Sequence, residues 1–511
     1  MVYTRGQWDD FDSWNTSGWT AEDVLPYLIK TETYHGPTTN ESTHGYSGPI
    51  HVSKGTHEAP RAEEGFIGGA VKAGFEEIVD LQSLHSNNGS GSWYRFVSPN
   101  DGRRQDVGHR YLHPLLQSGD YPILHVLVET QVLRVLFDDS KRAVGVEYRP
   151  NPSFATDSQD NTTRSVRAKK LVVASAGSFG TPLLLERSGV GDPAVLQKAG
   201  IPLVEPLPGV GNDFQAANSC STDHHFVGYV YRTSLTQNET INGIARNDRG
   251  RDVPAMIATN DPQLGWNGHD ASSKVRPSPA DIAALGPEFQ AAWDRDFKDS
   301  PNRPLMIWGL FNAFFGDTSS LPDDAQYVTT APWVTYPYAR GHIHLTGPSI
   351  DDAYDFDTGW LLDENDIDLK SHIWGYKTQR RMARRMSIIR GELASGHPKF
   401  AEGSNASIIE ISEGPINDEI EYSTEDDTAI VQYIRENIGT SRHPLGTCKM
   451  APREATGVVD ANLNVYGVTG LKIADLSVPP QQVAANTYNT ALMLGEKAAD
   501  IIIEELKLKQ K

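Results

Sequence analysis

A short apolar strand followed directly by a glycine turn and a helix start is the feature that most constrains this sequence. Residues 169–174 (KKLVVA) predict the strand and residues 175–180 (SAGSFG) the turn. Thr181 as N-cap and Pro182 as the first helical residue then predict the helix. Such a unit presents backbone N–H groups to an anion. The same order returns at the end, with a strand at 471–474 and a long helix at 489–505, so we predict an α/β protein.

The region between these two α/β blocks has a different character. Residues 221–430 are rich in aromatic residues and interrupted by polar and proline-containing loops. We therefore expect one discontinuous domain, formed by residues 1–220 and 431–511, with a mixed, mainly β domain of residues 221–430 inserted into it. In the first part, residues 122–148 contain three β-rich runs, and residues 138–141 (DDSK) predict a hairpin turn between the last two.

Charge and cysteine content exclude several classes of protein. Lys and Arg number 46 against 66 Asp and Glu, a formal net charge of −20 that is spread along the chain. Because phosphate binding needs a basic face, this argues against nucleic acid or an anionic membrane as a partner. Two cysteines do not make a disulfide framework, and no apolar run approaches the length of a membrane helix. The start has no signal-peptide core and the end no Ser-Lys-Leu signal, which leaves the compartment open with the balance toward the cytoplasm.

Several familiar catalytic and binding motifs are absent from the sequence. The dinucleotide fingerprint G-x-G-x-x-G fails because Ala194 and Phe214 stand where its last glycine belongs, and no Walker A loop, G-x-S-x-G elbow or H-E-x-x-H helix occurs. His224 and His225 lie beside Asp223, but adjacent side chains point in different directions. We interpret them as ordinary histidines and expect no metal site.

Two other stretches carry a specific resemblance. Residues 177–191 (GSFGTPLLLERSGVG) match one signature, and residues 441–450 (SRHPLGTCKM), 464–467 (NVYG) and 486–488 (NTY) form a second. Both resemble the glucose–methanol–choline (GMC) family of flavin oxidoreductases. Within it, residues 1–5 (MVYTR), 44–50 (HGYSGPI) and 338–344 (YARGHIH) are most similar to fungal short-chain alcohol (methanol) oxidases. The likeness covers nearly the whole chain.

The resemblance implies a reaction and two residues that perform it. Oxidising an alcohol requires a base for the hydroxyl proton and a group that holds the oxygen while a hydride moves to the flavin. A neutral imidazole suits the first task, and an amide donates to a developing alkoxide without titrating. By resemblance, His443 is the base and Asn486 its partner. The implied cofactor is FAD, and the implied reaction converts a primary alcohol to an aldehyde, with O₂ reduced to H₂O₂ if O₂ is the acceptor.

Cofactor contacts and fold follow from the same resemblance. Val132 matches the strand residue whose backbone meets the adenine, whereas Asp475, Leu476, Thr487 and Tyr488 match positions at the flavin ring and ribityl chain. The implied fold is a Rossmann-like FAD-binding domain, made of residues 1–220 and 431–511, with a substrate-binding domain at 221–430.

Three departures from the family pattern modify these expectations. Relatives begin with about a hundred residues that hold the glycine fingerprint and the ADP clamp, so we expect an FAD-binding domain truncated at its N-terminus. Residues 215–217 (QAA) replace the usual Gln-Asp-His, which we expect to remove a polar cluster. Arg442 stands where methanol-oxidising relatives have an aromatic residue, so we place it in the substrate pocket and expect a larger or acidic alcohol. A missing insertion leaves homo-oligomerisation open.

These departures keep alternatives open. The chain is either an FAD-dependent alcohol oxidase, a GMC dehydrogenase that uses another electron acceptor, or a truncated, non-catalytic homologue. Hydroxynitrile cleavage is a minor fourth reading.

Overall fold

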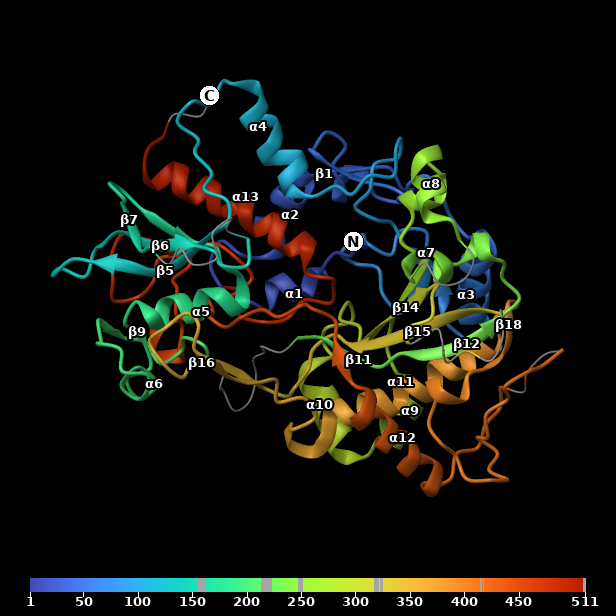
Figure 1. Ribbon diagram of the computed structural model, residues 1–511. Coiled ribbons are helices and arrows are strands. Elements are labelled where there is room, and N and C mark those ends of the chain that lie inside the picture. Colours follow the sequence, from blue (N-terminus) through green and yellow to red (C-terminus); the bar gives the residue numbers. More distant parts are fainter. Residues whose placement is uncertain are drawn as a thin grey trace.

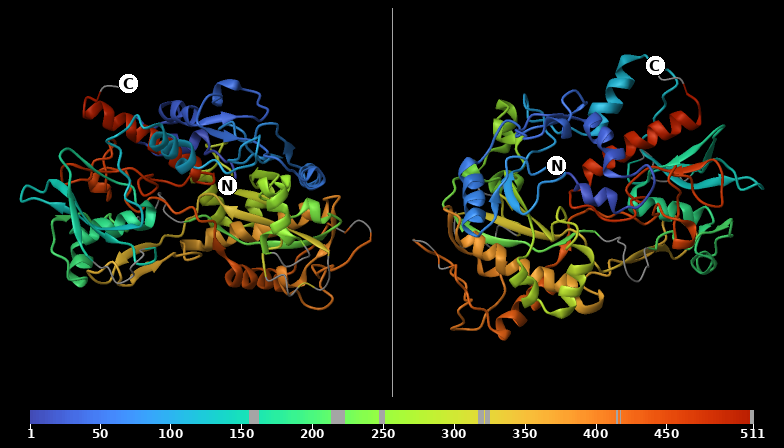
Figure 2. Two further views of the ribbon diagram at one scale, coloured as in Figure 1. Left: turned by 45° about the horizontal axis from the view of Figure 1, so that its top comes forward. Right: turned by 180° about the vertical axis from the view of Figure 1, so that it is seen from behind.

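Two halves, each around its own apolar core, make up the molecule (Figures 1 and 2). The computed structural model describes residues 1–154, 162–212, 223–246, 251–316, 321, 325–413, 416 and 418–508. The predicted boundaries at 220 and 430 stay predictions. One sheet of the second half takes strands from the first 220 residues, as described below.

The first half is built on two small sheets and three helices. A parallel pair is formed by β8 (Val172–Ala174) and β20 (Leu471–Ile473), and an antiparallel sheet by β5 (Thr130–Phe137), β6 (Ala143–Pro150) and β7 (Arg164–Arg167). These sheets lie beside α5 (Gly177–Arg187), α13 (Tyr488–Glu505) and α2 (Ala21–Thr31). The predicted hairpin at 138–141, the strand at 471–474 and the last helix are confirmed.

The predicted start of α5 is wrong. The helix begins at Gly177 with Ala176 as N-cap, and Pro182 lies inside it. Thr181 lies inside the helix, where its hydroxyl accepts the backbone N–H of Ala176 at 3.1 Å and donates to the Asp475 carboxylate at 2.6 Å. A proline inside a helix frees the carbonyl four residues earlier; here that is Ser178, whose carbonyl accepts the Thr447 hydroxyl at 2.6 Å.

The first of the three β-rich runs is also wrong, because residues 122–128 form no strand. Their apolar side chains have no sheet to pack on: Ile123 is 89% exposed and Val128 72%.

A nine-stranded sheet organises the second half. Its main order is β18-β12-β15-β14-β13-β4-β3, with β11 pairing β15 and β19 pairing β11. The strands are β3 (Glu76–Glu77), β4 (Gly89–Ser92), β11 (His225–Phe226), β12 (Tyr229–Thr233), β13 (Ala271–Val275), β14 (Met306–Phe311), β15 (Gln326–Val334), β18 (Ile389–Glu392) and β19 (Gly439–Thr440). Every residue of β15 is buried, because it lies in the middle of the sheet with α11 (Ile367–Arg384) against it.

Helices cover this sheet and are tied to it by charge as well as apolar packing. Against α11 pack α3 (Pro60–Lys72), α10 (Pro287–Asp296) and α12 (Thr424–Asn437). Glu392, in β18, accepts hydrogen bonds from Arg380 and Arg384 of α11 at 2.7 to 2.9 Å, and all three side chains are buried. The ion pairs fix α11 to the sheet edge.

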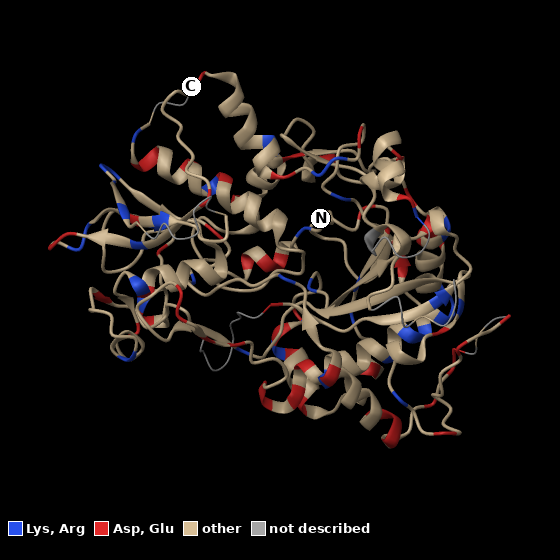
Figure 3. Cartoon of the chain, viewed as in Figure 1, with Lys and Arg blue, Asp and Glu red and all other residues tan. Residues whose placement is uncertain are grey.

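Shorter elements complete the chain. They are α1 (Trp8–Asp12), β1 (Glu32–Tyr34), β2 (Ile50–Val52), α4 (His113–Ser118), β9 (Val190–Gly191), α6 (Pro193–Lys198), β10 (Glu205–Pro206), α7 (Asn242–Arg246), α8 (Val253–Thr259), α9 (Pro279–Ala284), β16 (His342–Leu345) and β17 (Tyr354–Asp357). Acidic and basic residues are spread over both halves (Figure 3). Within the described part of the chain, every helix is too short or too polar to cross a bilayer.

Candidate active site

The loop that carries His443 leaves the edge of the nine-stranded sheet at β19 and is held by one carboxylate. Asp223 accepts the backbone N–H of His443 at 2.7 Å and that of Arg442 at 3.2 Å, and it accepts the hydroxyl of Thr440. Arg442 has a φ of 63°, in the left-handed region of backbone conformation that residues other than glycine rarely adopt. Surrounding contacts must therefore hold the backbone in this conformation. Asp223 supplies those contacts just before β11, the strand that pairs with β19.

The two side chains of the predicted catalytic pair are in contact. Nδ2 of Asn486 lies 3.0 Å from Nε2 of His443, although His443 follows β19 and Asn486 precedes α13. The Thr4 hydroxyl donates to Oδ1 of Asn486 at 2.7 Å, and Gln482 Nε2 donates to the His443 carbonyl at 3.1 Å. The side-chain amide of Asn486 and the backbone of His443 are therefore each held by a further side chain.

A second histidine lies behind the first. Nδ1 of His224 is 3.1 Å from Nδ1 of His443, and the rings meet edge to face. Nε2 of His224 is 2.9 Å from the Thr335 carbonyl oxygen. Burial lowers the pKa of His443 to about 3, and burial together with the neighbouring His443 lowers the pKa of His224 well below its ordinary value. Both rings are thus neutral at physiological pH.

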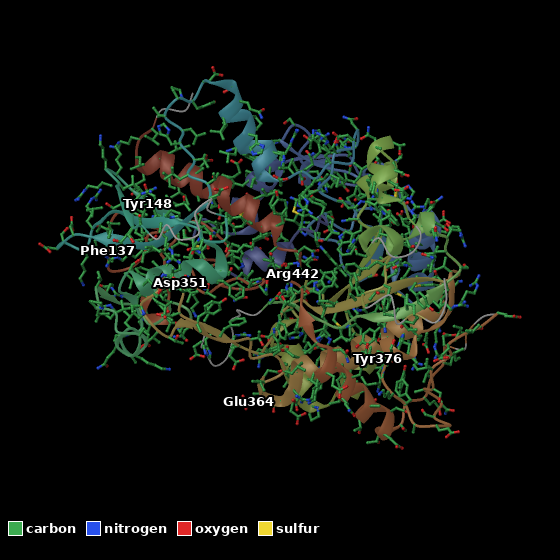
Figure 4. The ribbon with its side chains drawn as sticks, in the orientation of Figure 1. Phe137, Tyr148, Asp351, Glu364, Tyr376 and Arg442 are labelled. Atoms are coloured by element: carbon green, nitrogen blue, oxygen red, sulfur yellow. The ribbon has the colours of Figure 1, made fainter. Side chains whose placement is uncertain are left out.

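A cavity of about 590 Å³ opens in front of this pair. Its size falls in the usual range for a small-molecule or cofactor site. His443, Asn486, Arg442, Leu476, Thr487 and Tyr488 all line it, together with Met1, Val2, Asn267, His269, Ser441 and Ala491. Arg442 lies between the two halves, near the middle of the molecule (Figure 4). Six of the eight predicted site residues therefore share one cavity.

The remaining two predicted residues lie elsewhere. Asp475 does not line the cavity, because its carboxylate is occupied by the backbone N–H of Gly177 (3.0 Å), the Thr181 hydroxyl and the N–H of Ser477 (2.8 Å). It ties the end of β20 to the start of α5. Val132, in β5, is 40% exposed and does not line the cavity either.

The wall formed by the start of α13 has the chemistry to hold a flavin. The helix has no side-chain cap at Thr487 and no acidic residue in its first turn, so its N–H groups keep the partial positive charge of a helix N-terminus. Tyr488 and Ala491, in the first turn of the helix, line the cavity together with Thr487. A flavin ring carries carbonyl oxygens and ring nitrogens that need such donors. The residues present therefore fit the flavin end of FAD.

Sequence reasoning missed four residues that shape this site: Thr4, Asp223, His224 and Gln482. The polar cluster expected to be lost with residues 215–217 concerns positions outside the described residues, but Asp223 and His224 form a polar cluster beneath the catalytic loop. His224 and His225, interpreted from the sequence as ordinary histidines, are both fully buried, and His224 also contacts the predicted base. Within the described ranges, no group of three or more His, Cys, Asp or Glu side chains is placed to bind a metal.

Comparison with known proteins gives family matches at both ends of the chain. Two family models described as GMC oxidoreductase match residues 1–217 and 337–495. Alcohol oxidase 1 of Komagataella phaffii is 35% identical over 99% of this chain and 81% of its own length.

Two solved flavoenzymes share the fold. A formate oxidase from Aspergillus oryzae superposes with a TM-score of 0.81 at 19% identity, over 99% of this chain and 82% of that one. An FAD-dependent oxidoreductase from Chaetomium thermophilum gives a TM-score of 0.76 at 23% identity, over 100% of this chain and 85% of that one. These likenesses confirm the predicted α/β fold class.

Proposed function

We propose that this chain, which belongs to the GMC oxidoreductase family and uses FAD as its cofactor, oxidises a primary alcohol to an aldehyde with O₂ as electron acceptor. The balanced reaction is RCH₂OH + O₂ → RCHO + H₂O₂. The observation that carries the proposal is the contact between Asn486 Nδ2 and His443 Nε2 at 3.0 Å, at the wall of a cavity of about 590 Å³.

His443 is the base for the hydroxyl proton in this proposal. Burial lowers the pKa of His443, so Nε2 is unprotonated at neutral pH. Its lone pair accepts from Asn486 in this structure, and it accepts the hydroxyl proton when the substrate oxygen lies between the two side chains. Asn486 donates from Nδ2 to the same substrate oxygen as negative charge develops on it. When bound, FAD supplies the acceptor for the hydride that leaves the alcohol carbon.

Flavin contacts belong to Leu476, Thr487 and Tyr488 in this proposal, because these residues line the cavity beside the catalytic pair. Asp475 acts one step away, by holding the β20 end against α5. Val132 is kept as the adenine contact on the strength of the resemblance alone, since it lies outside the cavity.

Arg442 favours an alcohol that carries a carboxylate. Arg442 lines the cavity next to His443 and is exposed to solvent, so an ion pair with an anionic substrate is worth about 0.2 to 1 kcal/mol. The matched probes are 3-hydroxypropionate and 1-propanol, which differ by a carboxylate in place of a methyl group. We expect Arg442→Gln to lower the kcat/KM ratio of the acid to the neutral alcohol by roughly 1.5- to 5-fold. An unchanged ratio refutes this assignment.

The function itself is tested with purified protein loaded with FAD. Anaerobic mixing with alcohol should bleach the flavin absorbance, and admitting O₂ should restore it with one H₂O₂ per aldehyde formed. His443→Ala should remove the bleaching without removing the bound flavin. Protein that binds no FAD, or bleaching that persists in His443→Ala, contradicts the proposal. Bleaching followed by reoxidation with a quinone and not with O₂ assigns the chain to the dehydrogenases instead.

A further inference from the structure

His224 is a fully buried side chain with no part in the proposed chemistry, yet it contacts the proposed base directly. We propose that His224 is a positioning residue that fixes the tautomer of His443, so that Nδ1 carries the proton and Nε2 faces the substrate as a free base. This inference rests on the proposed function, because it concerns how the base of that reaction is prepared.

The first step is the protonation of His224 itself. Its Nε2 lies 2.9 Å from the carbonyl oxygen of Thr335. A carbonyl oxygen is only an acceptor, so a contact at this distance requires that Nε2 of His224 carries a hydrogen. The tautomer of His224 is therefore set by the backbone carbonyl of Thr335, the residue that follows β15.

The second step derives which nitrogen of His443 carries the hydrogen. The His224 ring is neutral, since no part of it is exposed and burial disfavours the imidazolium. A neutral ring with its hydrogen on Nε2 has a lone pair on Nδ1. That lone pair lies 3.1 Å from Nδ1 of His443, so Nδ1 of His443 must be the donor. His443 is neutral as well, which leaves its Nε2 without a hydrogen.

The third step approaches His443 from the opposite side and gives the same answer. Trp93 Nε1 is a donor only, and it donates to the Thr4 hydroxyl oxygen at 3.2 Å. Thr4 in turn donates to Oδ1 of Asn486 at 2.7 Å, which turns Nδ2 of that amide toward His443 Nε2 at 3.0 Å. An amide nitrogen donates, so Nε2 of His443 must accept.

One arrangement of protons satisfies the four contacts that link Thr335, His224, His443, Asn486 and Thr4. The other tautomer of His443 would place a hydrogen on Nε2 against the Asn486 amide and a lone pair on Nδ1 against the lone pair of His224. It would also be unable to accept the substrate proton. In serine proteases, loss of the residue that fixes the tautomer of the catalytic histidine lowers kcat by roughly 10⁴-fold.

Two variants of His224 separate this role from simple packing. His224→Leu keeps a similar volume and removes the acceptor, whereas His224→Asn retains an acceptor oxygen near the place of Nδ1. As a matched control, His397→Leu removes another buried histidine whose Nε2 also bonds a backbone carbonyl, that of Val230 at 3.0 Å, in a separate part of the second half.

The direct measurement is the ¹⁵N spectrum of histidine side chains, with the His443 signals identified by their absence in His443→Gln. We expect wild-type His443 to show a protonated Nδ1 and an unprotonated Nε2, also in His224→Asn and His397→Leu. His224→Leu should show a mixture of tautomers, with kcat for alcohol reduced 10- to 1,000-fold and largely restored in His224→Asn. This spectrum needs no turnover, so it reads the tautomer even if the proposed reaction fails.

Two results overturn the proposal. One is a wild-type spectrum in which Nε2 of His443 carries the hydrogen, which is decisive even if His224→Leu does not fold. The other is an unchanged His443 spectrum and a kcat within twofold of wild type in a folded His224→Leu protein.

Discussion

The hydroxyl of Thr4 offers a clean perturbation of the catalytic amide. Thr4→Val preserves the shape of the side chain and removes the donor that holds Oδ1 of Asn486 at 2.7 Å. Thr4 is 1% exposed, so water does not readily replace it. With Oδ1 unpaired, the amide loses the contact that distinguishes its two ends, and its oxygen is free to turn toward the lone pair of His443.

The expected size follows from the contacts that are lost. Leaving a buried acceptor without a donor costs about 1 to 3 kcal/mol. If that free energy disfavours the catalytic orientation of the Asn486 amide, kcat falls by about 5- to 150-fold, because each 1.4 kcal/mol is a factor of ten. Trp93 keeps a second acceptor, the Tyr3 carbonyl at 3.2 Å, so the fold is expected to lose less than the reaction does.

The assay is steady-state oxidation of a saturating primary alcohol, measured as H₂O₂ release, with urea unfolding of each variant beside it. Thr4→Ser keeps the hydroxyl and serves as the control, with a kcat expected within about twofold of wild type because the donor to Asn486 is retained. A Thr4→Val protein that unfolds like wild type and oxidises alcohol at the wild-type rate would refute the reasoning.

Three further predictions concern stability and reactivity. Burial raises the pKa of Asp223 to about 6, so the folded state holds its proton more tightly than the unfolded chain and stability falls as pH rises from about 4 to 6; urea unfolding should show Asp223→Asn gaining stability relative to wild type over that range. Burial would raise the pKa of Glu392, but the hydrogen bonds from Arg380 and Arg384 hold that pKa far below the ordinary range. Glu392→Gln leaves these two buried cations unpaired and should lower the free energy of unfolding by about 3 to 5 kcal/mol in urea at pH 7. An unchanged urea midpoint would contradict the ion-pair account. Burial also raises the pKa of the Cys448 thiol, so brief labelling at pH 8 should leave it unmodified in folded protein and modify it in urea, as read by peptide mass mapping.

Local signals account for the elements that sequence predicted correctly. The helix α13 and the hairpin between β5 and β6 need only apolar periodicity and a turn sequence, and the structure has both. The start of α5 was missed because Asp475, 294 positions from Thr181, accepts both the Thr181 hydroxyl and the backbone N–H of Gly177, the first residue of the helix. Charge-assisted hydrogen bonds to a distant carboxylate outweigh a local capping preference of about 1 kcal/mol.

The candidate site divides in the same way. The motif around His443 and the one around Asn486 are each recognisable in a few residues, and the structure brings the two side chains together, while their roles stay predictions. The sequence shows Asp223 and His224 only as a polar cluster with no assigned role, because they meet the catalytic loop from 220 and 219 positions away. Their contribution depends on the pairing of β11 with β19, which no pattern in either short strand announces.

The catalytic pair joins the end of β19 to the start of α13, so its geometry depends on how the two halves are seated on each other. His443 follows β19 at the nine-stranded sheet, whereas Asn486 precedes α13, which packs in the first half. A misplacement of about 1 Å between catalytic groups costs roughly 10²-fold in rate. Substitutions far from the cavity that tilt one half against the other are therefore expected to affect catalysis as strongly as substitutions inside it. Directed evolution of this chain should accordingly find gains in activity at the contacts between the two halves.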